Sequence, residues 1–272
     1  MKVLIDACLL LTFSAALAAS STLQILTTPD GIRFGLAGVK QPAPSPTVFF
    51  FGGGVEQSLT EPQYVEAQRE LGPGVVNVTI DLPGHGAELR AGEPAALQAW
   101  RYRLDHGEDL IGGVVRRANS VLEHLIRERY TDPAQVAVFG TSRGGFMAFH
   151  YAAAEPRVRH IAAFAPVTDL LTLREFSEMR DDSRARAIAA NVLAGRLVDR
   201  GIWIIIGSTD HRVGTHRAIE FTQRVVEAAE ARGQRPAIEL HIQPTEGHRV
   251  PDGCYAEAAR WLRKQWRIRA AQ

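Results

Sequence analysis

Cysteine is scarce in this chain, and an excess of charge of either sign is absent. The 272 residues include two cysteines, Cys8 and Cys254, which are too few for a disulfide framework or a cysteine-rich metal site. Lysine and arginine together number 31, against 30 aspartate and glutamate residues. Proteins that bind the phosphate backbone of nucleic acids carry a basic excess, so composition gives no support for nucleic-acid binding.

The N-terminal segment has the composition of an export signal. Residues 1–19 begin with a single lysine, continue through apolar residues and end in small ones, with Ala16-Leu17-Ala18 in the form of a signal-peptidase site. We therefore expect a signal peptide here and export to the periplasm or beyond, although Asp6 interrupts the apolar run; without a signal peptide the protein would be cytoplasmic. The segment is too short for a comfortable membrane span, so no stable span is expected after its removal.

Residues 20–272 have the size and composition of a single folded domain. Apolar residues make up 46% of the chain, which is enough for a sizeable core, and charged residues make up 22%. Neither an internal repeat nor a low-complexity stretch divides the chain. This length suits one large domain.

Short apolar runs alternate with segments of helical periodicity along most of this domain. Strands are expected at residues 23–26, 32–36, 48–51, 75–80, 136–139, 161–165, 203–206 and 238–242, and helices at 61–70, 106–130, 144–154, 215–231 and 252–266. The alternation predicts an α/β fold with a mostly parallel central sheet of about eight strands and helices on both faces. Residues 169–200 mix polar and apolar residues with helical character and are a candidate for a small lid.

One strand-to-helix junction contains a serine between glycines. Gly140-Thr141-Ser142-Arg143-Gly144 joins the strand at 136–139 to a helix, as in the Gly-x-Ser-x-Gly nucleophile elbow. Glycines on either side leave room for a sharp turn, and the N-terminus of the next helix favours negative charge. Ser142 is then the nucleophile, and the backbone N–H of Arg143 is one donor to an oxyanion. The alternative is a tight turn in which Ser142 only caps the helix.

A nucleophilic serine requires a base and a carboxylate that orients the base. Asp210 and His248 each follow a predicted strand, and they complete the chain order Ser, Asp, His that is expected of this kind of fold. Asp169 competes with Asp210 for the acid, and His211 and His241 compete with His248 for the base. We favour Asp210 and His248, since His241 lies inside a strand and His211 adjoins the acid too closely.

The second oxyanion donor is expected in the loop after the strand at 48–51. That loop is Gly52-Gly53-Gly54, and glycine allows a peptide N–H to turn toward an oxyanion. Gly53 or Gly54 is the expected donor, and the sequence leaves the choice between them open.

These motifs together resemble the α/β-hydrolase superfamily, and most closely its branch of dienelactone hydrolases and prolyl-oligopeptidase catalytic domains. The similar segments are residues 51–54, 81–86, 140–145, 207–213 and 246–248. The resemblance implies a Ser-Asp-His hydrolase that acts on a small-molecule ester or a short peptide without a metal or an organic cofactor. A serine stands where true dienelactone hydrolases have cysteine, which argues against that particular activity.

The sequence therefore predicts a serine hydrolase that cleaves a carboxylic ester through an acyl-enzyme intermediate. A serine peptidase or amidase with the same triad is the first alternative, because ester and amide cleavage use the same residues. A non-catalytic binding protein on the same scaffold is the second.

Overall fold

The computed structural model describes residues 23–179 and 181–268, so the predicted signal peptide lies outside the described residues and export stays a prediction. The strands are β1 (Gln24–Thr27), β2 (Arg33–Ala37), β3 (Ser45–Phe51), β4 (Val76–Ile80), β5 (Thr131–Thr141), β6 (Val158–Phe164), β7 (Gly201–Gly207) and β8 (Ile238–Gln243). They form one sheet in the order β1-β2-β4-β3-β5-β6-β7-β8. From β4 to β8 all neighbours run parallel, whereas β1 pairs antiparallel with β2, and β2 pairs antiparallel with β4. The predicted eight-stranded, mostly parallel sheet is confirmed.

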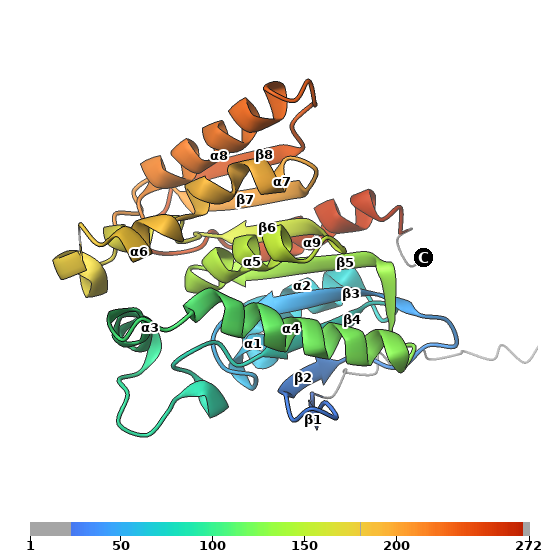
Figure 1. Ribbon diagram of the computed structural model, residues 1–272. Helices are drawn as coiled ribbons and strands as arrows, with labels where there is room; N and C mark the ends of the chain where they lie inside the picture. The colour runs from blue at the N-terminus through green and yellow to red at the C-terminus, as the bar shows by residue number, and fades with distance from the viewer. Residues whose placement is uncertain (1–22, 180, 269–272) are drawn as a thin grey trace, which may run out of the picture.

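Helices cover both faces of the sheet (Figure 1). The longer ones are α2 (Pro62–Leu71), α3 (Ala96–Asp105), α4 (Leu110–Arg127), α5 (Arg143–Ala154), α8 (Thr215–Glu230) and α9 (Cys254–Gln265); the short ones are α1 (Gln57–Thr60), α6 (Ser183–Ala187) and α7 (Ala194–Leu197). One face carries α3, α4, α5 and α8, and the other carries α1, α2 and α9. Within the described ranges, every helix falls short of the length or the apolarity that a membrane crossing requires.

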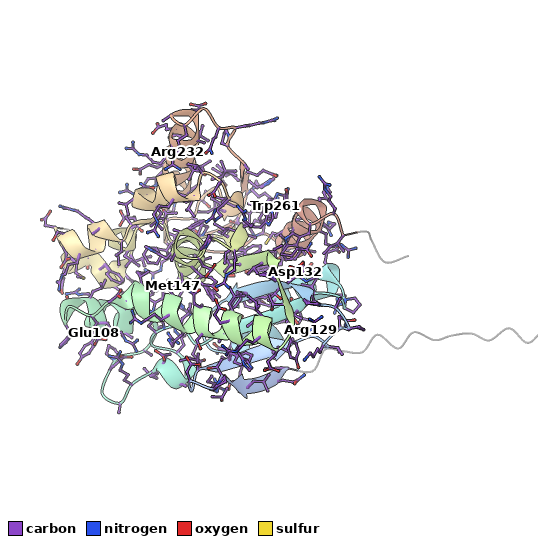
Figure 2. All side chains as sticks on the ribbon, turned by 45° about the vertical axis from the view of Figure 1, so that its right-hand side comes forward. Glu108, Arg129, Asp132, Met147, Arg232 and Trp261 are labelled. Atoms are coloured by element: carbon purple, nitrogen blue, oxygen red, sulfur yellow. The ribbon has the colours of Figure 1, made fainter. Side chains whose placement is uncertain are left out.

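The central strands β3, β5 and β7 contain uninterrupted apolar runs because each of them contributes side chains to two cores. In β3, Phe49 and Phe51 point into the core beneath α4 and α5, whereas Val48 and Phe50 point into the core beneath α2 and α9. Side chains alternate between the two faces of a strand, so a strand covered on both sides has no polar face. Figure 2 labels one residue of each core, Met147 on α5 and Trp261 on α9.

Two predicted boundaries are wrong. The helix expected at 106–130 is preceded by a separate helix, α3, and itself begins only at Leu110, where Asp109 accepts a hydrogen bond from the Gly112 backbone N–H at 2.7 Å. The strand expected at 136–139 begins earlier, at Thr131, so that Pro133 lies inside β5. Proline is tolerated there because the ladder between β3 and β5 pairs Thr131 and then resumes at Val136, which leaves the proline position unpaired.

The described residues of the candidate lid, 169–179 and 181–200, form several short helical segments. Besides α6 and α7 they include the 3₁₀ turns η2 (Leu170–Thr172), η3 (Arg174–Met179) and η4 (Ala190–Leu193). Apolar side chains from these turns, among them Leu170 and Phe176, are fully buried against the rest of the domain. A lid function for this segment stays a prediction.

Stability is expected to depend on pH through His150, which is buried on α5 and lies 2.8 Å, through Nε2, from the backbone oxygen of Ile188. Burial lowers the pKa of His150 to about 4. In the unfolded chain this histidine binds a proton near pH 6.5, whereas in the folded protein it stays neutral down to about pH 4. The contribution of the neutral His150 to the free energy of unfolding is therefore fully present above pH 6.5 and is lost as the pH falls toward 4. Between pH 7 and pH 5, the free energy of unfolding of the His150→Gln variant should therefore fall by about 2 kcal/mol less than that of the wild type.

Urea unfolding at the two pH values measures this difference. His106→Gln, a change at an exposed histidine, is the matched control and should decline like the wild type. An equal decline in His150→Gln would show that His150 does not carry the effect.

Candidate active site

Ser142 lies on a strained turn at the end of the central strand β5. Its backbone has φ 53° and ψ −115°, a conformation that residues other than glycine seldom adopt. The turn is fixed by the neighbouring strand, because the Ser142 N–H donates to Phe164 O at 2.8 Å and Ser142 O accepts from the Val167 N–H at 3.0 Å. Such strain persists only where the surrounding structure enforces it, and it is common at functional sites.

The glycines of the motif are required by close packing around this turn. A Cβ added to Gly140 would lie 2.3 Å from Gly144 O, and one added to Gly144 would lie 1.7 Å from Phe51 O. Real Cβ atoms do not approach other atoms so closely. Helix α5 therefore starts in direct contact with the ends of β3 and β5, and its first turn lies against the serine.

The structure brings Ser142, His248 and Asp210 together at the carboxyl edge of the sheet. The distance from His248 Nε2 to Ser142 Oγ is 2.9 Å, and that from His248 Nδ1 to Asp210 Oδ2 is 2.7 Å. A carboxylate can only accept, so Nδ1 carries the proton and Nε2 accepts a hydrogen bond from the Ser142 hydroxyl. The Ser142 hydroxyl makes no cap hydrogen bond to α5, which removes the helix-cap interpretation.

Asp210 is buried and its carboxylate is fully hydrogen-bonded. Oδ1 accepts from the backbone N–H groups of Arg212 at 2.9 Å and Val213 at 3.1 Å, which leaves Oδ2 for His248. Burial opposes the charged form, but the hydrogen bonds from His248 and from these N–H groups hold the pKa of Asp210 below its usual value. The carboxylate is therefore an anion directed at the histidine.

The competing residues lie elsewhere. Asp169 accepts a hydrogen bond from the Leu171 N–H at 2.9 Å and caps the turn η2. His241 lies in the edge strand β8, where its ring packs at a tilt against Trp203 of β7 and its Nε2 is 3.4 Å from Glu239. His211 is exposed on the turn after β7.

The three-glycine loop borders the same site, and its two candidate donors differ. Gly53 lines the cavity beside Ser142, whereas Gly54 does not. The Gly53 N–H donates to Ser58 Oγ at 3.1 Å, and Ser58 Oγ donates to Gly54 O at 2.8 Å. Location therefore favours Gly53, although its N–H has a partner that an oxyanion would have to replace or share.

Two side chains from the 81–86 loop support the glycine loop. Asp81 is buried, pairs with Arg33 at 2.8 Å and accepts from the Val55 N–H at 2.8 Å. His85 packs on Gly53, where an added Cβ would lie 3.0 Å from His85 Cδ2. Burial and the nearby Arg143 charge lower the pKa of His85, so its imidazole is neutral.

A cavity of about 300 Å³ opens at Ser142 and His248. Its wall is mainly polar and includes Gln57, Glu61, Tyr64, Leu97, Arg143 and Arg212. Burial raises the pKa of Tyr64 to about 12, so its hydroxyl is neutral. The sequence identified Arg143 only for its backbone N–H and did not identify the other five as part of the site. They come from α1, α2, α3 and the turn after β7, and only the tertiary fold brings these segments together.

Within residues 23–179 and 181–268, no three side chains of the metal-ligating kind gather in one place. The cavity instead presents two guanidinium groups, one carboxylate and several neutral hydrogen-bonding groups. These groups suit the recognition of a polar organic molecule.

The fold and the comparisons with known proteins define the class of protein as a serine hydrolase. The family model for the prolyl oligopeptidase family matches residues 114–267, more than half of the chain. The chain belongs to this family, as the resemblance in its motifs predicts. A comparison with curated protein sequences gives no match.

Solved structures with the same fold include both esterases and peptidases. TT1662 from Thermus thermophilus is 20% identical with a TM-score of 0.66, over 92% of this chain and 99% of that one. Acetyl xylan esterase 1 from Thermoanaerobacterium sp. JW/SL YS485 is 18% identical with a TM-score of 0.63, over 93% and 86%. Dipeptidyl peptidase 4 from Porphyromonas gingivalis is also 18% identical, with a TM-score of 0.63, over 90% of this chain but 35% of that one. At these identities the likeness is one of fold.

The packing at the elbow makes Gly144 intolerant of substitution. In Gly144→Ala the new methyl group meets a backbone oxygen, so we expect a loss of stability of roughly 1–3 kcal/mol or more together with a loss of activity. In Gly113→Ala on α4 the methyl group meets open space, and the higher helix propensity of alanine should raise the free energy of unfolding by up to about 1 kcal/mol. Thermal unfolding of both variants measures the contrast, and a Gly144→Ala protein that melts like the wild type would contradict the packing argument.

Proposed function

We propose that this protein hydrolyses a carboxylic ester through a Ser142–His248–Asp210 triad and an acyl-enzyme intermediate. The proposal rests on one observation, the continuous hydrogen-bond chain of 2.9 Å and 2.7 Å from Ser142 through His248 to Asp210. These distances lie within the range in which a base can take a proton from a nucleophile.

Acylation begins when Ser142 Oγ attacks the substrate carbonyl carbon. The hydroxyl proton passes to His248 Nε2, and Asp210 stabilises the imidazolium that forms. The carbonyl oxygen becomes an oxyanion and receives hydrogen bonds from the Arg143 N–H and the Gly53 N–H. One such donor contributes on the order of 3 kcal/mol to transition-state stabilisation.

The collapse of this intermediate breaks the ester bond. His248 gives its proton to the leaving alkoxide, and the acyl group stays on Ser142. A water molecule then attacks the acyl-enzyme while His248 takes a proton from it. As the bond between the acyl group and Ser142 Oγ breaks, His248 returns this proton to Oγ, and the acid product leaves. The Ser142 hydroxyl is regenerated, so the cycle needs no co-reactant other than water.

A peptide or amide is the second candidate substrate, and membership of the prolyl oligopeptidase family supports it. The triad serves both reactions, because they differ only in the group that His248 protonates. A panel of p-nitrophenyl esters against aminoacyl p-nitroanilides separates the two. Hydrolysis of the anilides at comparable kcat/KM would replace the ester proposal with a peptidase.

Ser142 should be the only site of reaction with a fluorophosphonate probe. The wild-type protein is expected to carry the label on the peptide that contains Ser142, and Ser142→Ala to carry none, because an activated hydroxyl is needed for attack at phosphorus. Mass spectrometry of the digested protein locates the label. Equal labelling of the two proteins would contradict the assignment.

The two candidate acids can be separated by matched substitutions. Asp210→Asn removes the charge that orients His248, so kcat should fall roughly 10³–10⁴-fold. Asp169→Asn alters a turn cap and should change kcat by less than about tenfold. Ester hydrolysis under saturating substrate measures both, and the reverse order would make Asp169 the acid of the triad.

A further inference from the structure

Like the Glu61 carboxylate, the guanidinium of Arg143 lines the cavity without a direct counter-ion among the described residues. Among the described residues it makes no hydrogen bond and no ion pair within 4.0 Å, and its Nε is buried without a partner. Buried and partly buried arginines elsewhere in the domain are paired, for example Arg103 with Glu93 at 2.6 Å and Arg117 with Glu88 at 3.3 Å. A partly buried cation that lacks a partner costs stability, and the retention of Arg143 beside the serine points to a ligand.

The groups around Arg143 do not neutralise it. Burial lowers the pKa of Arg143, while the more distant charge of Glu61 acts in the opposite direction. Glu175 is also near, but both of its oxygens accept from Arg212 Nη2 at 2.7 Å. Tyr64 stays neutral, since its pKa is raised to about 12. The Arg143 guanidinium therefore keeps its positive charge with donors unused.

The Arg143 guanidinium lies close to the atoms that react. Arg143 follows Ser142 in the chain, and its side chain lines the same cavity as Ser142 and His248. An added Cβ on Gly53 would lie 3.5 Å from Arg143 Nη2, so the guanidinium passes beside the glycine loop that borders the serine. A planar fork of donors in this position matches the two oxygens of a carboxylate.

We propose that the substrate carries a carboxylate, which Arg143 binds while Ser142 attacks the ester carbonyl. This inference rests on the proposed function and specifies its substrate class as the esters of acid-bearing molecules. Arg143 thereby has two roles, with its N–H directed at the oxyanion and its side chain determining specificity.

Two matched pairs of esters test this proposal. The first pair has the charge on the acyl side, mono-p-nitrophenyl glutarate and its methyl ester. The second has it on the leaving-group side, 4-acetoxybenzoate and its methyl ester. In at least one pair, the wild-type kcat/KM should be roughly ten times higher for the acid-bearing member, and Arg143→Met should abolish that ratio. Arg232→Met, a change in the exposed turn after α8 (Figure 2), should keep it.

A ratio near one in both pairs for the wild type, or a ratio that survives in Arg143→Met, would overturn the proposal. Failure of the proposed function is distinct, because then neither member of a pair is hydrolysed and Ser142 is not labelled. A further measurement needs no variant: glutarate should protect wild-type Ser142 from the fluorophosphonate, whereas the neutral glutaramide should not. Equal protection by the two compounds would also contradict a role for the charge.

Discussion

The crowded turn at Ser142 is the constraint on which the rest of the site depends. Its positive φ is held by hydrogen bonds to the end of β6, and the start of α5 leaves no room for a side chain at Gly144. This packing leaves the Ser142 hydroxyl without a backbone hydrogen bond to α5 and places it at the carboxyl edge of the sheet, next to His248. Everything else in the proposed mechanism, from the base to the oxyanion donors, is arranged around that one oxygen.

The electrostatics of the site follow from the burial of Asp210 and the partial exposure of His248 to the cavity. Asp210 is fully buried, and backbone N–H groups stabilise its charge, whereas the His248 side chain is 29% exposed. An imidazolium formed during catalysis would therefore face a fixed anion without first displacing water. On the other wall, Arg212 is paired with Glu175, so the Arg143 guanidinium is the positive group that is left without an ion pair.

The sequence predicted the parts of this arrangement that rest on local patterns. Uninterrupted apolar runs identify strands buried on both faces, and the order of strands places Ser142, Asp210 and His248 at one edge. Hydrophobic periodicity does not predict the break between α3 and α4, because this break depends on the helix cap by Asp109. The cavity wall could not be predicted either, because Glu61 and Tyr64 reach the site only through the packing of α2 on the sheet. The Gly53 N–H bond to Ser58 is likewise a tertiary contact that no motif encodes.

The central claim is that Ser142 forms a covalent acyl intermediate. Rapid acid quench of the protein with p-nitrophenyl acetate, followed by peptide mass spectrometry, tests this claim directly. The account predicts a burst of p-nitrophenolate close to one equivalent and an acetyl group on the peptide that contains Ser142. Steady turnover without a burst, and with no acetyl group on that peptide, would contradict it.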